Sequence, residues 1–312
     1  MLLALGMNMV IAIAKFIAGF IGGSASMLSE GAHSVADTIN EVFLLASIKQ
    51  SARPADRTHP FGYGMNRFFW SLLAAVGIFV TGALFSLYEG ITGLFHPAGE
   101  QGSYWLSLGV LALAFVLEGT SWLRAVRQLR GEARERGRSM VEHVRRSTDP
   151  SVKTVFSEDS AALVGLIIAA IGVTLHKVTG NPIWDAIGAI CIGVLLAVVA
   201  FLLGRDTKSL LIGEAADPEL RRELWRQLLS YDEVDSVVEV LTMNLGPDSI
   251  LVAVRLDLGP TLNSDQIERL SSRISDEISA RHPEVTQVFL DATPASAEQR
   301  HRAAEIAQQL GI

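Results

Sequence analysis

Six apolar segments, each about as long as a lipid bilayer is thick, constrain this 312-residue chain more than any other feature. An α-helix needs about 20 mostly apolar residues to cross the hydrocarbon core. The strands of a membrane barrel would alternate apolar and polar residues, and these segments do not. The sequence therefore predicts a bundle of six transmembrane helices, at residues 2–22, 27–48, 69–95, 104–123, 155–175 and 183–203.

The basic residues between these segments predict the orientation of the bundle. Four Lys and Arg residues follow the second segment and nine follow the fourth, whereas the connections after the first and third have none. Connections rich in Lys and Arg stay in the cytoplasm. We therefore expect a multi-pass protein of the cell (inner) membrane, in contact with lipid, with its N- and C-termini in the cytoplasm.

The last third of the chain has the charged composition of a water-soluble domain. We expect a transmembrane domain at residues 1–204, a cytoplasmic domain at 205–293 and a polar tail at 294–312. The predicted elements of the second domain are a helix starting at Asp217-Pro218, strands at 234–244 and 249–258, a helix starting at 263–265, and a strand at 286–291. This αββαβ order predicts a small ferredoxin-like α+β domain, whose sheet we expect to be antiparallel with its helices on one face.

Several classes of function are not supported by the sequence. The net charge is −7, and membrane topology explains the basic run between Arg124 and Arg146, so we expect no nucleic-acid partner. A membrane zinc protease would carry His-Glu-x-x-His and a rhomboid-like enzyme Gly-x-Ser-x-Gly. Neither pattern is present, so we expect neither an enzyme nor a bound cofactor.

The second apolar segment carries a polar stripe, formed by Glu30, His33, Asp37 and either Asn40 or Glu41. Residues three or four apart share a helix face, and ionisable groups within a membrane are costly enough to indicate function. His33 and Asp37 can direct an imidazole and a carboxylate at one ion, and a tetrahedral metal such as Zn²⁺ accepts both. The alternative is that the two side chains only bond to each other and join helices.

A complete metal site needs ligands from a second helix, and the fifth segment begins with the acidic pair Glu158-Asp159. Either carboxylate could complete the coordination. Adjacent positions on a helix lie about 100° apart, so the two are not expected to face the same ion. In the alternative interpretation, the pair stabilises the N-terminus of its helix.

Lys15 and Glu118 are further charged residues within the apolar segments. Lys15 is midway along the first segment and is expected to pair with a carboxylate or to extend toward the membrane surface. Glu118 lies near the end of the fourth segment, and we interpret it as interfacial or structural.

These features resemble the cation diffusion facilitator family over residues 1–293. The resemblance rests on His33-x-x-x-Asp37, on the His-Pro-Phe-Gly-Tyr-Gly motif at 59–64, and on the acidic start of the fifth segment. It implies a homodimer that exports a divalent transition metal from the cytoplasm in exchange for protons. Two ligands would come from the second helix and two from the fifth. Zn²⁺ is the expected ion, and Mn²⁺, Fe²⁺ and Co²⁺ also suit one imidazole with two carboxylates.

The sequence departs from the family pattern at Val155, where typical members carry His or Asp. The fourth ligand is therefore open among Glu158, Ser160 and water. Asp56 and His59 match a second metal site of the family in the loop after the second helix, but Tyr63 stands where some members have His. The alternative function is a transport-deficient membrane scaffold or a metal-sensing dimer of the same fold.

Overall fold

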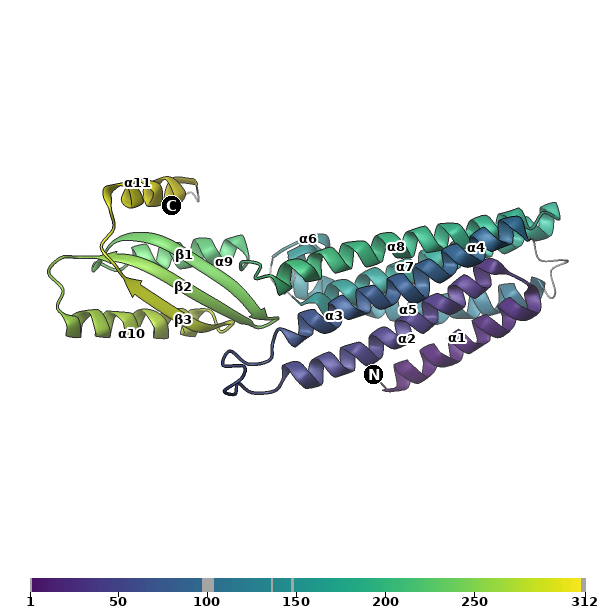
Figure 1. The fold of residues 1–312 in the computed structure, drawn as a ribbon, viewed down its shortest axis with the longest axis horizontal. Helices are drawn as coiled ribbons and strands as arrows, with labels where there is room; N and C mark the ends of the chain where they lie inside the picture. The colour runs from purple at the N-terminus through teal and green to yellow at the C-terminus, as the bar shows by residue number, and fades with distance from the viewer. Residues whose placement is uncertain (1, 97–103, 136, 147–148, 310–312) are drawn as a thin grey trace. The chain divides into compact units, whose positions relative to one another are not determined.

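A computed structural model of the chain describes residues 2–96, 104–135, 137–146 and 149–309 (Figure 1). The connection at 97–103, the basic residue Arg136 and the last three residues of the tail lie outside the described residues. The chain forms two compact units, Met1–Arg53 with Asn66–Lys208, and Pro54–Met65 with Ser209–Ile312. The loop at 54–65 therefore packs with the C-terminal part of the chain, although it connects two helices of the first unit.

The first unit is helical, and a helix occupies each of the six predicted apolar segments. The third of these is interrupted by a π-helical stretch, η1, which joins α3 to α4. The helices are α1 (Leu2–Gly22), α2 (Ala25–Ser51), α3 (Asn66–Gly77), η1 (Ile78–Leu84), α4 (Phe85–Phe95), α5 (Tyr104–Glu135), α6 (Met140–Arg146), α7 (Pro150–Thr179) and α8 (Ile183–Leu211).

Four helical stretches of the described residues are long and apolar enough to cross a membrane: Asn66–Phe95, Tyr104–Glu135, Val152–Thr179 and Ile183–Leu211. The apolar part of α1 is shorter, and the charged residues of the polar stripe interrupt α2. The crossing of the membrane by α1 and α2 therefore stays a prediction.

Helix α2 begins at a turn that is held by Asp185 at the start of α8. Gly23 adopts a left-handed conformation (φ 62°) that favours glycine, and Ser24 caps the helix. The Asp185 carboxylate accepts hydrogen bonds from Ser24 Oγ at 2.8 Å, from the Ala25 N–H at 2.6 Å and from the Ser26 hydroxyl. An anion at a helix N-terminus is favourable, so α8 positions the start of the helix that carries the polar stripe.

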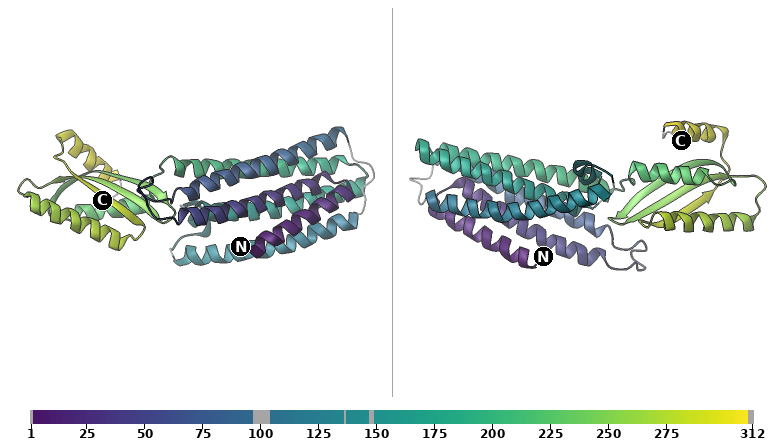
Figure 2. Two further views of the ribbon diagram at one scale, coloured as in Figure 1. Left: turned by 60° about the horizontal axis from the view of Figure 1, so that its bottom comes forward. Right: turned by 180° about the vertical axis from the view of Figure 1, so that it is seen from behind.

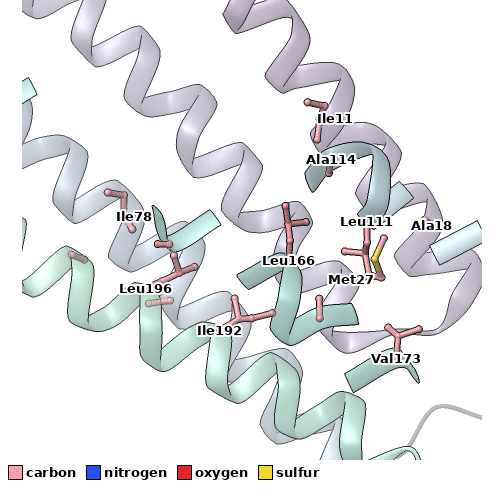
Figure 3. Close-up of a cluster of buried hydrophobic side chains, with 14 of the residues drawn as sticks. Ile11, Ala18, Met27, Ile78, Leu111, Ala114, Leu166, Val173, Ile192 and Leu196 are labelled. Carbon is pink, nitrogen blue, oxygen red and sulfur yellow. The ribbon is translucent and has the colours of Figure 1, made fainter. Parts of the chain in front are cut away.

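Helix α2 lies between α1 and α3 and also contacts η1, α4 and α7 (Figures 1 and 2). Its Met27 belongs to an apolar core with Leu111 of α5, Leu166 of α7 and Ile192 of α8 (Figure 3). On the outer surfaces, many large apolar side chains are exposed, among them Phe79, Val116 and Phe201. An exposed apolar surface of this extent suits helices that face lipid.

The second unit contains a three-stranded sheet in the order β1-β2-β3. Asp217 caps α9 by accepting a hydrogen bond from the Glu219 N–H at 2.8 Å, and Asn263 forms a capping box with Gln266 at the start of α10. The elements are α9 (Pro218–Leu229), β1 (Val234–Gly246), β2 (Ser249–Leu258), α10 (Ser264–Arg281), β3 (Val285–Ala292) and α11 (Ala297–Gln309).

The prediction of a wholly antiparallel sheet was wrong for β3. Strands β1 and β2 pair antiparallel across the expected tight turn, but β3 pairs parallel to β2. Helix α10 connects these two strands and returns the chain to the end of the sheet at which β2 begins, as a parallel crossover requires. Helices α9 and α10 pack on the same apolar core, where Leu224 and Ile274 meet the inward-facing Val252 and Val254 of β2.

The other face of the sheet carries a half-exposed apolar row and the loop at 54–65. Leu241, Ala253 and Phe289 are aligned across the three strands. Phe61 of the loop packs edge-on against Phe289, with 6.4 Å between the ring centroids. Gly64 approaches β1 so closely that a Cβ there would lie 2.5 Å from the carbonyl oxygen of Leu245. The loop is thus built into the second unit by close packing.

Candidate metal centre

The polar stripe of α2 faces the interior of the helical bundle. Glu30, His33 and Asn40 are buried, and Asp37 is partly buried. Asn40 points toward α7, whereas Glu41 accepts a hydrogen bond from Asn8 of α1 at 3.1 Å. Asn40 therefore continues the stripe toward α7, and one oxygen of Glu41 is turned toward α1.

His33 and Asp37 lie side by side, one helical turn apart. The His33 Nδ1 atom is 3.5 Å from Asp37 Oδ1, and the imidazole is 1% exposed. Neither ring nitrogen of His33, nor Asp37 Oδ1, has a hydrogen-bond partner among the described residues. A buried polar atom without a partner costs about 1–3 kcal/mol. Several such atoms in one place are consistent with a site that a bound ion or water completes.

The acidic pair of α7 lies opposite this stripe, because α2 and α7 pack together. Asn40 donates a short hydrogen bond to one oxygen of Glu158, and the other oxygen of Glu158 has no partner in the described chain. Asp159 likewise keeps one buried oxygen, Oδ2, without a partner among the described side chains. Both carboxylates lie within electrostatic range of Asp37.

These groups form two half-sites on facing helices and not a closed coordination shell. Within the described residues, no three His, Cys, Asp or Glu side chains are already placed to hold one ion. The donor set nevertheless fits a divalent transition metal, because it offers an imidazole nitrogen and carboxylate oxygens with unused acceptor capacity. The assignment of His33, Asp37, Asp159 and Glu158 as ligands therefore stays a prediction.

The position of the missing fourth ligand is apolar and next to the stripe. Val155 lines a small cavity together with Asn40, Phe43 and Trp70. The Ser160 hydroxyl donates to the Phe156 carbonyl at 2.7 Å and accepts from the indole N–H of Trp122 at 3.0 Å. Since Ser160 is engaged in this way, Glu158 or water is the better candidate.

A second buried cluster involves residues whose connection the sequence does not reveal. Lys15 of α1 contacts Glu30 of the stripe, which confirms that it pairs with a carboxylate. It also contacts Glu118 of α5, whose side chain is 14% exposed. Of the two interpretations of Glu118, interfacial or structural, this ion pair supports the structural one. A lysine in an apolar helix was the available signal, but nothing in the sequence identifies a partner 103 residues away.

The loop residues Asp56 and His59 form a local turn. Asp56 Oδ1 accepts hydrogen bonds from the Thr58 and His59 N–H groups, and Oδ2 accepts from the Tyr63 hydroxyl, each at 2.8 Å. These bonds, that of Tyr63 first, lower the pKa of the Asp56 carboxyl. The His59 Nδ1 atom is 3.8 Å from Asp56 Oδ1, and both side chains are about half exposed. The expected loop metal site stays a prediction, and its carboxylate already has internal donors.

The family model of the cation efflux transmembrane domain matches residues 1–212 of this chain. The chain is 39% identical over 244 residues to the proton-coupled zinc antiporter SLC30A9, mitochondrial, of Xenopus laevis, covering 78% of the chain and 43% of that relative. The human protein of the same name is 35% identical over 280 residues, covering 88% of the chain and 49% of that relative. The chain thus spans about half the length of these relatives. The manganese efflux system protein MneP of Bacillus subtilis is 23% identical over 299 residues, covering 94% of both chains.

Proposed function

Since this chain belongs to the cation diffusion facilitator family, we propose that it exports a divalent transition metal from the cytoplasm in exchange for protons. The observation that carries the proposal is the group of unpartnered polar atoms in the bundle. Both nitrogens of His33, Asp37 Oδ1 and Asp159 Oδ2 have no hydrogen-bond partner among the described residues. A transported cation would supply the missing interactions, with His33, Asp37 and Asp159 as ligands and Glu158 or water as the fourth.

Zn²⁺ is the proposed cargo. One imidazole with carboxylates suits Zn²⁺, although Mn²⁺, Fe²⁺ and Co²⁺ accept the same donors. Two related proteins support this range, since one is named as a zinc antiporter and another as a manganese efflux protein.

Proton exchange follows from the chemistry of these ligands. A metal ion binds neutral imidazole and ionised carboxylates, so metal and protons compete for the same groups. Protons that enter from the far side of the membrane would displace the ion there. Export would then be driven by proton entry, with no need for ATP.

We propose that the chain crosses the cell (inner) membrane six times, with both termini in the cytoplasm. The basic connections after α2 and around α6 support this orientation.

We also propose that the functional unit is a homodimer. The half-exposed row of Leu241, Ala253 and Phe289 supports this, because an apolar sheet face of this kind suits burial against a second copy.

Transport by the purified protein in liposomes tests the function. An inward-directed proton gradient should drive Zn²⁺ movement, and trials with Mn²⁺, Fe²⁺ and Co²⁺ should rank the ions. The alternative of a transport-deficient scaffold or metal-sensing dimer is favoured by Val155, which removes one family ligand. That alternative predicts an intact dimer that moves no ion under any gradient.

A further inference from the structure

The ammonium group of Lys15 is enclosed by oxygen atoms inside the helical bundle. Its Nζ atom lies 3.0 Å from Glu30 Oε2, 2.9 Å from Ser34 Oγ and 2.9 Å from Glu118 Oε1. The side chains of Lys15 and Glu30 are fully buried. A lysine ammonium has three N–H donors, so these contacts use its full capacity.

Without the ammonium, the same three oxygens form a site for a small cation. Two carboxylates and a hydroxyl, contributed by α2 and α5, converge on one point. Carboxylate and hydroxyl oxygens are the ligands that hard divalent ions such as Mn²⁺ prefer. The combined charge of two ionised carboxylates also matches one divalent ion.

Helix α7 is shaped to accommodate this group of oxygens. A Cβ at Gly165 would overlap Glu30 Oε1, so glycine leaves the space that the carboxylate fills. Glu30 Oε1 and Glu118 Oε2 have no hydrogen-bond partner within the described part of the chain. Each of these two carboxylates therefore keeps one oxygen with acceptor capacity that the lysine does not use.

We propose that Lys15 acts as a tethered cation that occupies this oxygen site and keeps metal ions out of it. The proposal rests on the proposed function insofar as it assigns the transported ion to the adjacent turn of α2, at His33 and Asp37. With Lys15 in place, the mixed nitrogen and oxygen site alone is open to the cargo. The lysine thereby limits the bundle to one ion and disfavours ions that prefer oxygen ligands only.

The test is a metal-binding measurement in a chain whose transport site is disabled. We would place Lys15→Ala in a His33→Ala/Asp159→Asn background, purify the protein in detergent and measure bound Mn²⁺ by equilibrium dialysis. The expected result is one additional Mn²⁺ per protomer relative to the background. That ion should be lost when Glu30→Gln and Glu118→Gln are added. Because the readout is a difference in binding, it remains valid even if the proposed transport function fails.

Thermal unfolding with and without Mn²⁺ tests the proposal even if Lys15→Ala is less stable than the background. Removing one partner of a buried ion pair leaves uncompensated charge, so Mn²⁺ should raise the Tm of Lys15→Ala and leave the background unchanged. The neutral variant Lys15→Met/Glu30→Gln/Glu118→Gln is the matched control and should not respond to Mn²⁺. A Lys15→Ala chain that gains neither bound Mn²⁺ nor a higher Tm would overturn the proposal. So would extra Mn²⁺ that persists without both glutamates.

Discussion

Two regions of this protein place a histidine and an aspartate within one helical turn or loop turn of each other, and they differ in what surrounds the pair. In α2, His33 and Asp37 lie inside the bundle, and three of their polar atoms have no hydrogen-bond partner among the described residues. In the loop at 54–65, Asp56 and His59 are about half exposed, and both Asp56 oxygens accept hydrogen bonds from the loop itself.

The comparison shows that residue types alone do not identify a metal site. In the loop, hydrogen bonds from the chain satisfy the carboxylate, and water can reach the imidazole. In α2, burial limits the access of water, so the unmet hydrogen-bonding capacity suits a bound ion. The same two residue types, histidine and aspartate, therefore stabilise a turn in one region and suit a transported cation in the other.

The largest effect should come from the buried pair. His33→Ala or Asp37→Ala removes a proposed ligand, so Zn²⁺ transport in liposomes should fall to the background rate while the protein stays folded. The matched change in the loop, His59→Ala, should leave most of the transport activity. Near-normal transport by either α2 variant would place the cargo elsewhere, and an equal loss in the loop variant would remove the distinction.

The acidic pair of α7 should divide into two roles. Asp159→Asn removes a proposed ligand, and since supporting residues of metal sites already contribute about 10–100-fold, Zn²⁺ affinity should fall at least about 100-fold. Glu158→Gln should largely preserve binding and change its pH dependence, because Asn40 already holds that carboxylate. Calorimetry at several pH values would measure both. The reverse pattern would make Glu158 the ligand that substitutes for the one missing at Val155.

The identity of the α2 imidazole should set ion preference. Replacing it with a carboxylate in His33→Asp makes the site richer in oxygen, which favours harder ions. Competition of Mn²⁺ or Fe²⁺ against Zn²⁺ in the liposome assay should therefore increase about tenfold, which corresponds to about 1.4 kcal/mol of relative affinity. An unchanged ion profile would argue against direct coordination by His33.

The smallest effect should come from Tyr63→Phe in the loop. The Tyr63 hydroxyl is the main cause of the lowered pKa of Asp56, so its removal should raise that pKa toward the usual value of about 3.9. A lowered pKa stabilises the fold above the pKa of the unfolded chain, and that contribution is lost as the pH falls through the folded value. The stability of the Tyr63→Phe variant should therefore fall less steeply as the pH is lowered. Carboxyl NMR titration would detect the change, while Zn²⁺ transport should not respond.

Much of the architecture could be predicted because it depends on local patterns. The apolar runs predict where the helices of the first unit lie, and Asp217 and Asn263 predict where α9 and α10 begin. The spacing of His33 and Asp37 places them together because a helix repeats every 3.6 residues. The direction of β3 could not be predicted this way, since it depends on where α10 returns the chain.

By itself, the sequence determined which segments are helical, which helix carries the polar stripe and which residue types are available as ligands. These properties follow from composition and from the period of a single helix. Only the tertiary structure decided which side chains meet across elements: Lys15 with Glu118 and Asn40 with Glu158 between helices, and Phe61 of the loop with Phe289 of β3. The physical reason is that the rotation of each helix about its axis depends on packing against all its neighbours, and no period within one segment records it.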